Sequence, residues 1–204
     1  MASSRRGRPP GGDSTQTHRR IVDAARLVFT RRGYAGGTIS EIAQNSGLAA
    51  SAIYHHFGGK ADLYEEVFKV TSEATWNDVS ERSVRAPTLC AAIVEMVDNA
   101  THLSEHLPYY SDFLAMVPAE ASLHPEFAHL LDRRAKNQDE RFTHLAELGC
   151  ATGELEGFEV PVATEIIRAA IMGWFFERHF RGGELPHGGE ALVALFERLA
   201  AHRA

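Results

Sequence analysis

The chain has 204 residues, of which 44% are hydrophobic and 24% are charged, as in an ordinary globular protein. This length is enough for one large domain, or for a small domain joined to a medium one. No apolar run is long enough to cross a membrane, and no apolar segment follows the N-terminal arginines. We therefore expect a cytoplasmic protein with neither a membrane span nor a secretory signal.

Charge is divided unevenly along the sequence, although the net charge is only −6. Residues 1–62 hold nine Lys or Arg against four Asp or Glu, a net charge of +5. Residues 63–204 hold 12 Lys or Arg against 23 Asp or Glu, a net charge of −11. A basic region joined to an acidic body is typical of a protein that binds a polyanion through one end.

The N-terminal region begins without any helical pattern. Residues 1–16 are rich in Gly, Pro, Ser and Arg and lack apolar periodicity, which predicts a disordered arm. From Thr17 to Gly33, apolar side chains recur at helical spacing and predict a first helix.

Two short helices are predicted next. The run Thr38-Ile39-Ser40-Glu41 fits a capping box, in which the Thr38 side chain caps the second helix and Glu41 reaches back to the Thr38 amide. Gly47 ends that helix, and a third helix is predicted over residues 50–57, before the Gly-Gly pair at 58–59. Two short helices joined by a tight turn with glycine form a helix-turn-helix, whose second helix fits the major groove of DNA.

The run from Thr38 to Leu63 resembles the DNA-binding region of the TetR (tetracycline-repressor-like) family of transcriptional regulators. It reads T-I-S-E-I-A, then G-L, I-Y-H-H-F and K-A-D-L, where the family typically has T-x-x-x-I-A, G-V, L-Y-x-H-F and K-x-x-L. The resemblance covers residues 17–64, and the rest of the chain matches the family only in length and helical layout. It implies a regulator that binds double-stranded DNA.

The resemblance also implies which side chains contact the duplex. The base edges are faced by Ala49, Ala50, Ser51 and His55, and the phosphate backbone is gripped by Thr38, Tyr54, His56 and Lys60. So small a base-facing surface predicts modest discrimination, with DNA shape and dimer spacing contributing the rest. Ala49 stands where family members often carry Ser or Thr, and losing that helix cap costs about 1 kcal/mol.

The arm contains a second candidate contact. The segment Arg5-Arg6-Gly7-Arg8-Pro9-Pro10 resembles an AT-hook core, whose arginines lie in a narrow A·T minor groove. The alternative is a solvated tail that makes no DNA contact.

The remaining sequence is predicted to be helical as well. A fourth helix begins at Lys60 and runs towards Val79, and five more are predicted over residues 89–106 (capped by Thr88), 109–117, 125–148 (ended by Gly149), 161–180 and 190–201. No useful β-alternation is present. The expected fold is therefore all-α, with about nine helices: a three-helix helix-turn-helix domain over 17–62, fused to a C-terminal helical bundle over 63–204.

The C-terminal half has two apolar features of interest. The resemblance implies an effector cavity there, and its predicted lining is Tyr109, Phe113, Met116, Phe142 and Trp174, with core packing as the alternative. In the family, the last two helices pair with those of a second copy as a four-helix bundle. The predicted dimer contacts are Ile167, Ile171, Leu192, Leu195, Phe196 and Leu199.

Neither a metal site nor a catalytic site is predicted. Cys90 and Cys150 lack metal-ligand spacing, and we expect reduced thiols without a disulfide. His102 and His106 lie at i, i+4 with Asp98 one turn earlier, but no second motif completes a metal site. The sequence lacks phosphate-binding loops, nucleophile elbows and zinc-protease motifs, so we expect no cofactor and no enzyme.

The predicted function is a homodimeric repressor that binds a palindromic operator and is released by an apolar or amphipathic small molecule. Two alternatives stay open: a DNA-binding activator or architectural protein without a ligand, and a ligand-binding helical module that has lost DNA binding. Operator sequence, target genes and effector identity are not specified by the sequence.

Overall fold

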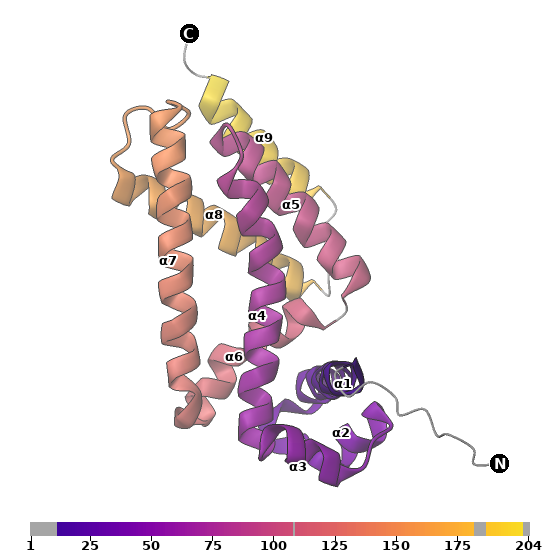
Figure 1. Ribbon diagram of the computed structural model, residues 1–204. Helices are drawn as coiled ribbons and strands as arrows, with labels where there is room; N and C mark the ends of the chain where they lie inside the picture. The colour runs from indigo at the N-terminus through magenta and orange to yellow at the C-terminus, as the bar shows by residue number, and fades with distance from the viewer. Residues whose placement is uncertain (1–11, 108, 182–186, 202–204) are drawn as a thin grey trace, which may run out of the picture. The chain divides into compact units, whose positions relative to one another are not determined.

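The computed structural model describes residues 12–107, 109–181 and 187–201. The described residues contain no strand, and their helices confirm the predicted all-α fold (Figure 1). The helices are α1 (Gly12–Gly36), α2 (Ile39–Ser46), α3 (Ala50–Phe57), α4 (Lys60–Val84), α5 (Leu89–His106), α6 (Tyr110–Leu123), the short 3₁₀ helix η1 (Pro125–Phe127), α7 (Ala128–Ala151), α8 (Val160–Phe180) and α9 (Gly188–Ala201). None of these helices, over the residues described, is long and apolar enough to cross a membrane.

The chain divides into two compact units. Residues up to Val67 form the first unit, and residues from Phe68 onwards form the second. The division falls inside α4, which continues from one unit into the other, and the predicted domain boundary after residue 62 falls inside the same helix. The first unit therefore contains the predicted helix-turn-helix, and the second contains the predicted bundle.

Helix α1 begins earlier than the sequence pattern indicates. It starts at Gly12, so residues 12–16, which composition assigned to the disordered arm, are helical. Gly33 has φ 68° and ψ 174° and interrupts the helical backbone, as predicted, because glycine alone adopts this conformation easily. The buried side of α1 supplies much of the core of the first unit: Ile21, Val22, Ala24, Ala25, Val28 and Phe29.

The region around residue 125 also differs from the prediction. Helix α6 continues to Leu123, beyond the predicted end at Val117, with Pro118 inside it. Pro125 opens η1, and α7 itself begins at Ala128. Proline is suited to the first turn of either kind of helix, so its position in the sequence could not distinguish them.

Gly149 does not end α7, as the sequence predicted, but lies inside it. The helix continues to Ala151, and Gly149 is buried. A Cβ atom at this position would lie 2.8 Å from Leu89 Cδ2 and 2.9 Å from Leu155 Cδ1. The glycine therefore permits close packing of α7 against the side chains of Leu89 and Leu155.

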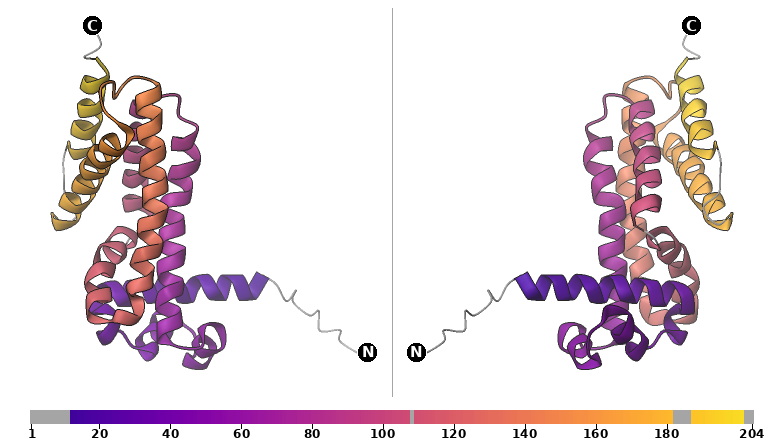
Figure 2. Two further views of the ribbon diagram at one scale, coloured as in Figure 1. Left: turned by 90° about the vertical axis from the view of Figure 1, so that its left-hand side faces the viewer. Right: turned by 90° about the vertical axis from the view of Figure 1, so that its right-hand side faces the viewer.

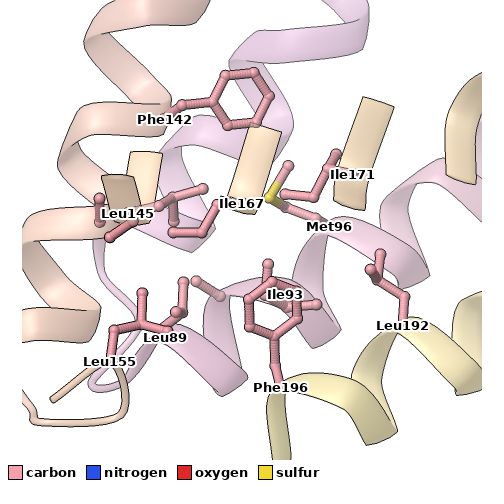
Figure 3. Close-up of a cluster of buried hydrophobic side chains, with 13 residues drawn as sticks. Leu89, Ile93, Met96, Phe142, Leu145, Leu155, Ile167, Ile171, Leu192 and Phe196 are labelled. Carbon is pink, nitrogen blue, oxygen red and sulfur yellow. The ribbon is translucent and has the colours of Figure 1, made fainter. Parts of the chain in front are cut away.

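The core of the second unit is a cluster of hydrophobic side chains from α5, α7, α8, α9 and the turn after α7 (Figure 3). Its thirteen buried members are Leu89, Ala92, Ile93, Met96, Phe142, Leu145, Ala146, Leu155, Ala163, Ile167, Ile171, Leu192 and Phe196. Helices α8 and α9 lie side by side at one edge of this unit (Figure 2).

This cluster corrects the predicted dimer surface. Ile167, Ile171, Leu192 and Phe196 are at most 7% exposed, because they fill the core of their own chain. Leu199 also packs partly against that core, and of the predicted set only Leu195, at 47% exposed, is freely accessible. Both sides of α8 and α9 are apolar, and the inward side is the one that the sequence pattern selected.

Candidate functional site

The turn between α2 and α3 is built on Gly47. Its backbone is left-handed, with φ 65° and ψ 32°. The N–H groups of Gly47 and Leu48 donate to carbonyl groups of α2 at 3.2 and 3.0 Å, a pattern that closes a helix and redirects the chain. Arg20 of α1 donates through Nη2 to the Ser46 carbonyl at 2.6 Å. Together these bonds fix where α3 starts within the first unit.

Helix α3 has one buried side and one exposed side. Ile53 and Phe57 are 0% and 9% exposed, and the Phe57 ring centroid lies 4.9 Å from that of His18 on α1. The opposite side is exposed and carries four of the predicted DNA contacts: Ala50, Ser51, Tyr54 and His55. Two small residues, a phenol and an imidazole thus form one accessible helical face, the shape that direct base readout requires.

The two helix starts differ in their capping. Thr38 is exposed, and its Oγ1 accepts a hydrogen bond from the Glu41 N–H at 3.1 Å, which is one half of the predicted capping box. Among the described residues, the second half, from the Thr38 N–H to the Glu41 carboxylate, is not formed. The Glu41 carboxylate lies 3.6 Å from Arg32 Nε. Ala49 takes the N-cap position of α3 with φ −76° and ψ 147° and offers no side-chain hydrogen bond, so α3 lacks the cap whose loss the sequence indicated.

Lys60 and His56 are both partly exposed, and both make contacts within the first unit. The Lys60 ammonium donates to the carbonyl groups of Gly37 at 3.0 Å and Ala35 at 3.4 Å, and it lies 4.5 Å from the Tyr34 ring centroid. An ammonium group has three donors, so one remains for a phosphate. His56 is partly buried, with its ring centroid 6.0 Å from that of Phe57. Both residues hold the first unit together as well as lying near its exposed face.

The arginines of the predicted AT-hook, Arg5, Arg6 and Arg8, lie outside the described residues. The groove-binding arm is therefore still a hypothesis based on sequence. The same holds for the metal-compatible spacing at His102 and His106, because the His106 side chain is not described; among described side chains, no group of three potential metal ligands comes together.

The second unit contains an open apolar cavity of about 660 Å³, counting the space at its mouth. Its lining is mostly apolar, with three polar side chains: Ile93, Met96, Val97, Asn99, Ala100, Ser111, Leu114, Arg134, Ile171, Met172, Trp174, Phe175 and Leu192. The cavity is therefore bounded by α5, α6, α7, α8 and α9.

A second cavity, of about 460 Å³, lies between α4 and α7 of the same unit. Its lining is polar and carries four cationic side chains against one carboxylate: Phe68, Lys69, Ser72, Glu73, Arg133, Arg134, Asn137, Gln138 and Arg141. Burial lowers the pKa of Arg134, and burial likewise lowers the pKa of Arg141, where the nearby Glu140 opposes the effect. The electrostatic character of this cavity is therefore cationic.

Comparison with known proteins finds a family that matches part of the first unit. Residues 21–67 match the family described as bacterial regulatory proteins, tetR family. The transcriptional regulator SrpR of Pseudomonas putida is 35% identical over 60 residues, which cover 29% of this chain and 28% of SrpR. Residues 21–67 of the chain are therefore similar to the TetR family. Because it matches SrpR over so short a part of that protein's length, the similarity to SrpR identifies the DNA-binding region.

Solved structures extend the likeness in fold over most of the chain. A putative transcriptional regulator from Saccharomonospora viridis, in complex with choline, has a TM-score of 0.75 at 19% identity, covering 90% of this chain and 96% of that one. FadR from Bacillus subtilis, in complex with stearoyl-CoA, has a TM-score of 0.69 at 20% identity, covering 92% and 100%. Both of these proteins are described as transcriptional regulators.

Of the predicted effector-pocket residues, Trp174 alone lines the large apolar cavity. Phe113 and Phe142 are each 1% exposed; Phe142 belongs to the core cluster and Phe113 is buried in the same unit. Tyr109 precedes α6 in a left-handed conformation with φ 70°, and Met116 is partly buried outside the cavity lining. Phe113 and Phe142 are therefore core residues and do not line the cavity.

The sequence analysis did not predict that Arg134 and Asn99 line the apolar cavity, where they are two of its polar side chains. Arg134 lies four residues after Leu130 and eight before Phe142, both buried, so helical periodicity places it on the inner side of α7. Periodicity could therefore have predicted the position of Arg134, but the adjacent Arg133 and the charged residues nearby are typical of a solvated surface. Nothing in the pattern around Asn99 marks it as a cavity residue.

Proposed function

We propose that this chain is a homodimeric transcriptional repressor that binds a palindromic DNA operator through α3 and is released by a small-molecule effector. The observation that carries the proposal is the exposed face of α3, held in place by buried Ile53 and Phe57 and by the turn at Gly47. The net charge of +5 over residues 1–62 supports the same interface, since most of the affinity of such proteins comes from phosphates.

DNA contacts divide into two sets in this proposal. Ser51 and His55 supply hydrogen bonds to base edges, and the methyl groups of Ala49 and Ala50 contact thymine methyl groups. Tyr54, which is 54% exposed, and Thr38 donate hydrogen bonds from their hydroxyl groups to phosphate oxygens. Lys60 contributes its remaining donor and His56 its imidazole, both of them beside the face rather than on it.

A second copy is proposed to pair through the outer sides of α8 and α9. Large apolar side chains are exposed there: Val162 (51%), Phe176 (42%), Phe180 (78%) and Leu195 (47%). Small residues, Ala169 and Gly173, are exposed between them on α8 and allow close approach of a partner helix. An isologous dimer presents two α3 helices to two half-sites, which is why the operator is expected to be palindromic.

The effector is proposed to occupy the apolar cavity of the second unit. FadR holds stearoyl-CoA and the S. viridis regulator holds choline in their structures, so folds of this kind accommodate chemically different ligands. Because α4 continues from one unit into the other, it is the proposed lever between cavity and DNA. An effector releases the operator only if it binds the non-binding state better, by several kcal/mol for a complete switch.

The test is selection of bound sequences from a random duplex pool by the full-length protein, at two salt concentrations. Enrichment of a palindrome, with affinity that falls steeply as salt rises, is the expected result. Binding without enrichment of any sequence would refute operator recognition by α3. We propose that the protein acts in the cytoplasm, because that compartment contains the DNA.

A further inference from the structure

Arg134 lines both cavities of the second unit, so its guanidinium stands where an apolar space and a cationic space approach each other. On the apolar side it meets a wall that includes Leu114, Trp174 and Phe175. On the other side its neighbours in the lining are Lys69, Arg133 and Arg141. Arg134 therefore belongs to a site that is apolar on one side and cationic on the other.

The Arg134 side chain is partly buried and is held in place by a hydrogen bond. Its Nη1 donates to the Leu114 carbonyl at 3.0 Å, which ties α7 to α6. A guanidinium has five N–H donors, so this bond leaves others available. Among the described residues, Arg134 forms no ion pair, although Glu73 lines the cationic cavity with it. Cations removed from water are normally paired with a carboxylate.

Asn99 is a second group in the same cavity that lacks a partner. Its Nδ2 is buried and has no hydrogen-bond partner among the described residues, although Asn99 lines the apolar space. A buried polar group without a partner costs about 1–3 kcal/mol unless a ligand or a water satisfies it. The mostly apolar cavity therefore offers an amide that lacks an acceptor and a cation that lacks a carboxylate partner.

We infer that the effector is an amphipathic anion, whose apolar body occupies the cavity lined by Trp174, Phe175 and Leu192 and whose acidic head binds Arg134. A carboxylate, sulfonate or phosphate head supplies the missing negative charge in the bidentate geometry that arginine favours. Asn99 donates to an oxygen of the bound molecule. The inference rests on the proposed effector site and specifies its ligand class from this chain's own residues.

The experiment measures binding by calorimetry with the full-length protein and matched probes. Each probe carries one of three heads, a carboxylate, an alcohol or a trimethylammonium group, on either a decyl chain or a naphthyl body. Decyl phosphate is added to separate carboxylate from phosphate recognition. The carboxylate is expected to bind about tenfold or more tightly than the alcohol on at least one body, because hydrogen bonds to charged groups exceed neutral ones.

Two variants locate the preference. In R134Q the ratio between carboxylate and alcohol falls to near one, while R134K, which keeps the charge but not the fork, retains part of it. K136Q is the matched control, since it removes a positive charge from an exposed position of α7 that lines neither cavity, and it leaves the preference within about threefold of wild type. Circular dichroism confirms that each variant is folded.

The inference would be overturned by no binding of any anionic probe, by equal binding of anion and alcohol, or by a preference that survives in R134Q. Tighter binding of the trimethylammonium probes would do so as well. Operator binding is measured separately in the presence of each probe. Anion binding that leaves operator affinity unchanged would refute the release mechanism while supporting the ligand class, so the two failures are distinguishable.

Discussion

The Glu154 carboxylate accepts a hydrogen bond from the backbone N–H of Leu89 at 2.6 Å, across 65 residues of sequence. Its second oxygen accepts from the Cys90 N–H at 2.9 Å, and Thr152 Oγ1 donates to the first at 2.7 Å. Glu154 is only 8% exposed. A carboxylate from the turn after α7 thus caps the N-terminus of α5, where the helix dipole favours a negative charge. Helix α5 also lines the proposed effector cavity.

Replacing this capping carboxylate is expected to destabilise the second unit. E154A leaves two amides at the start of α5 without their acceptor, and the free energy of unfolding should fall by about 2 kcal/mol. Urea denaturation followed by circular dichroism measures the change. E156A, at an exposed position in the same turn, is the control and should differ from wild type by less than about 0.5 kcal/mol. Equal stability of E154A and E156A would contradict the capping role.

Supplying the cap that α3 lacks is expected to stabilise it. In A49S a hydroxyl takes the N-cap position and accepts from an N–H of the first turn, which contributes about 1 kcal/mol. Hydrogen exchange of the α3 amides should slow by about fivefold, the factor that this free energy corresponds to. A50S places the same side chain inside the helix, where it caps nothing, and should give no gain. Similar effects of the two substitutions would argue against capping.

Disrupting the outer surface of α8 is expected to separate the proposed dimer. F180E places a charge at the most exposed apolar side chain of that surface, and analytical ultracentrifugation should show a shift towards monomer at micromolar concentration. L123E alters an equally accessible leucine, 75% exposed at the end of α6, and should leave the association unchanged. If both variants or neither dissociated, the α8–α9 surface would not be the interface.

Cys90 is expected to react slowly with alkylating agents at neutral pH. Burial first, and then the carboxylates of Glu197 and Glu154, raise the pKa of this thiol above its ordinary value. In a C150S background the rate of alkylation should therefore keep rising with pH beyond the range of an unperturbed cysteine. E197Q removes one carboxylate and should move the profile to lower pH. An identical profile in E197Q would show that this charge does not act on Cys90.

Local signals predicted the helix-turn-helix well because each element there is specified by neighbouring residues. Gly47 lies just before α3, and the Gly-Gly pair at 58–59 lies just after it. The i, i+4 spacing of Ile53 and Phe57 identifies the buried side of this helix. Thr38 caps α2 through contacts only three residues apart. None of these features depends on residues distant in sequence, so composition and spacing were sufficient.

The second unit was predicted less well because its details depend on packing between distant segments. Helix α8 is apolar on two sides, with Ile167 and Ile171 turned inwards and Phe176 and Phe180 exposed. Periodicity alone could not tell which side meets the chain's own core and which is accessible to another molecule. The apolar cavity likewise depends on gaps left between five helices, which no local pattern records.

The central claim, that α3 reads an operator, is tested most directly by repeating the DNA selection with the double variant S51A/H55A. The account predicts that wild type enriches a palindrome and that the variant loses base preference at the same positions of both half-sites. Its nonspecific affinity and salt dependence should change little, because phosphate contacts are retained. Selection of the wild-type palindrome, undiminished, by S51A/H55A would contradict recognition through the exposed face of α3.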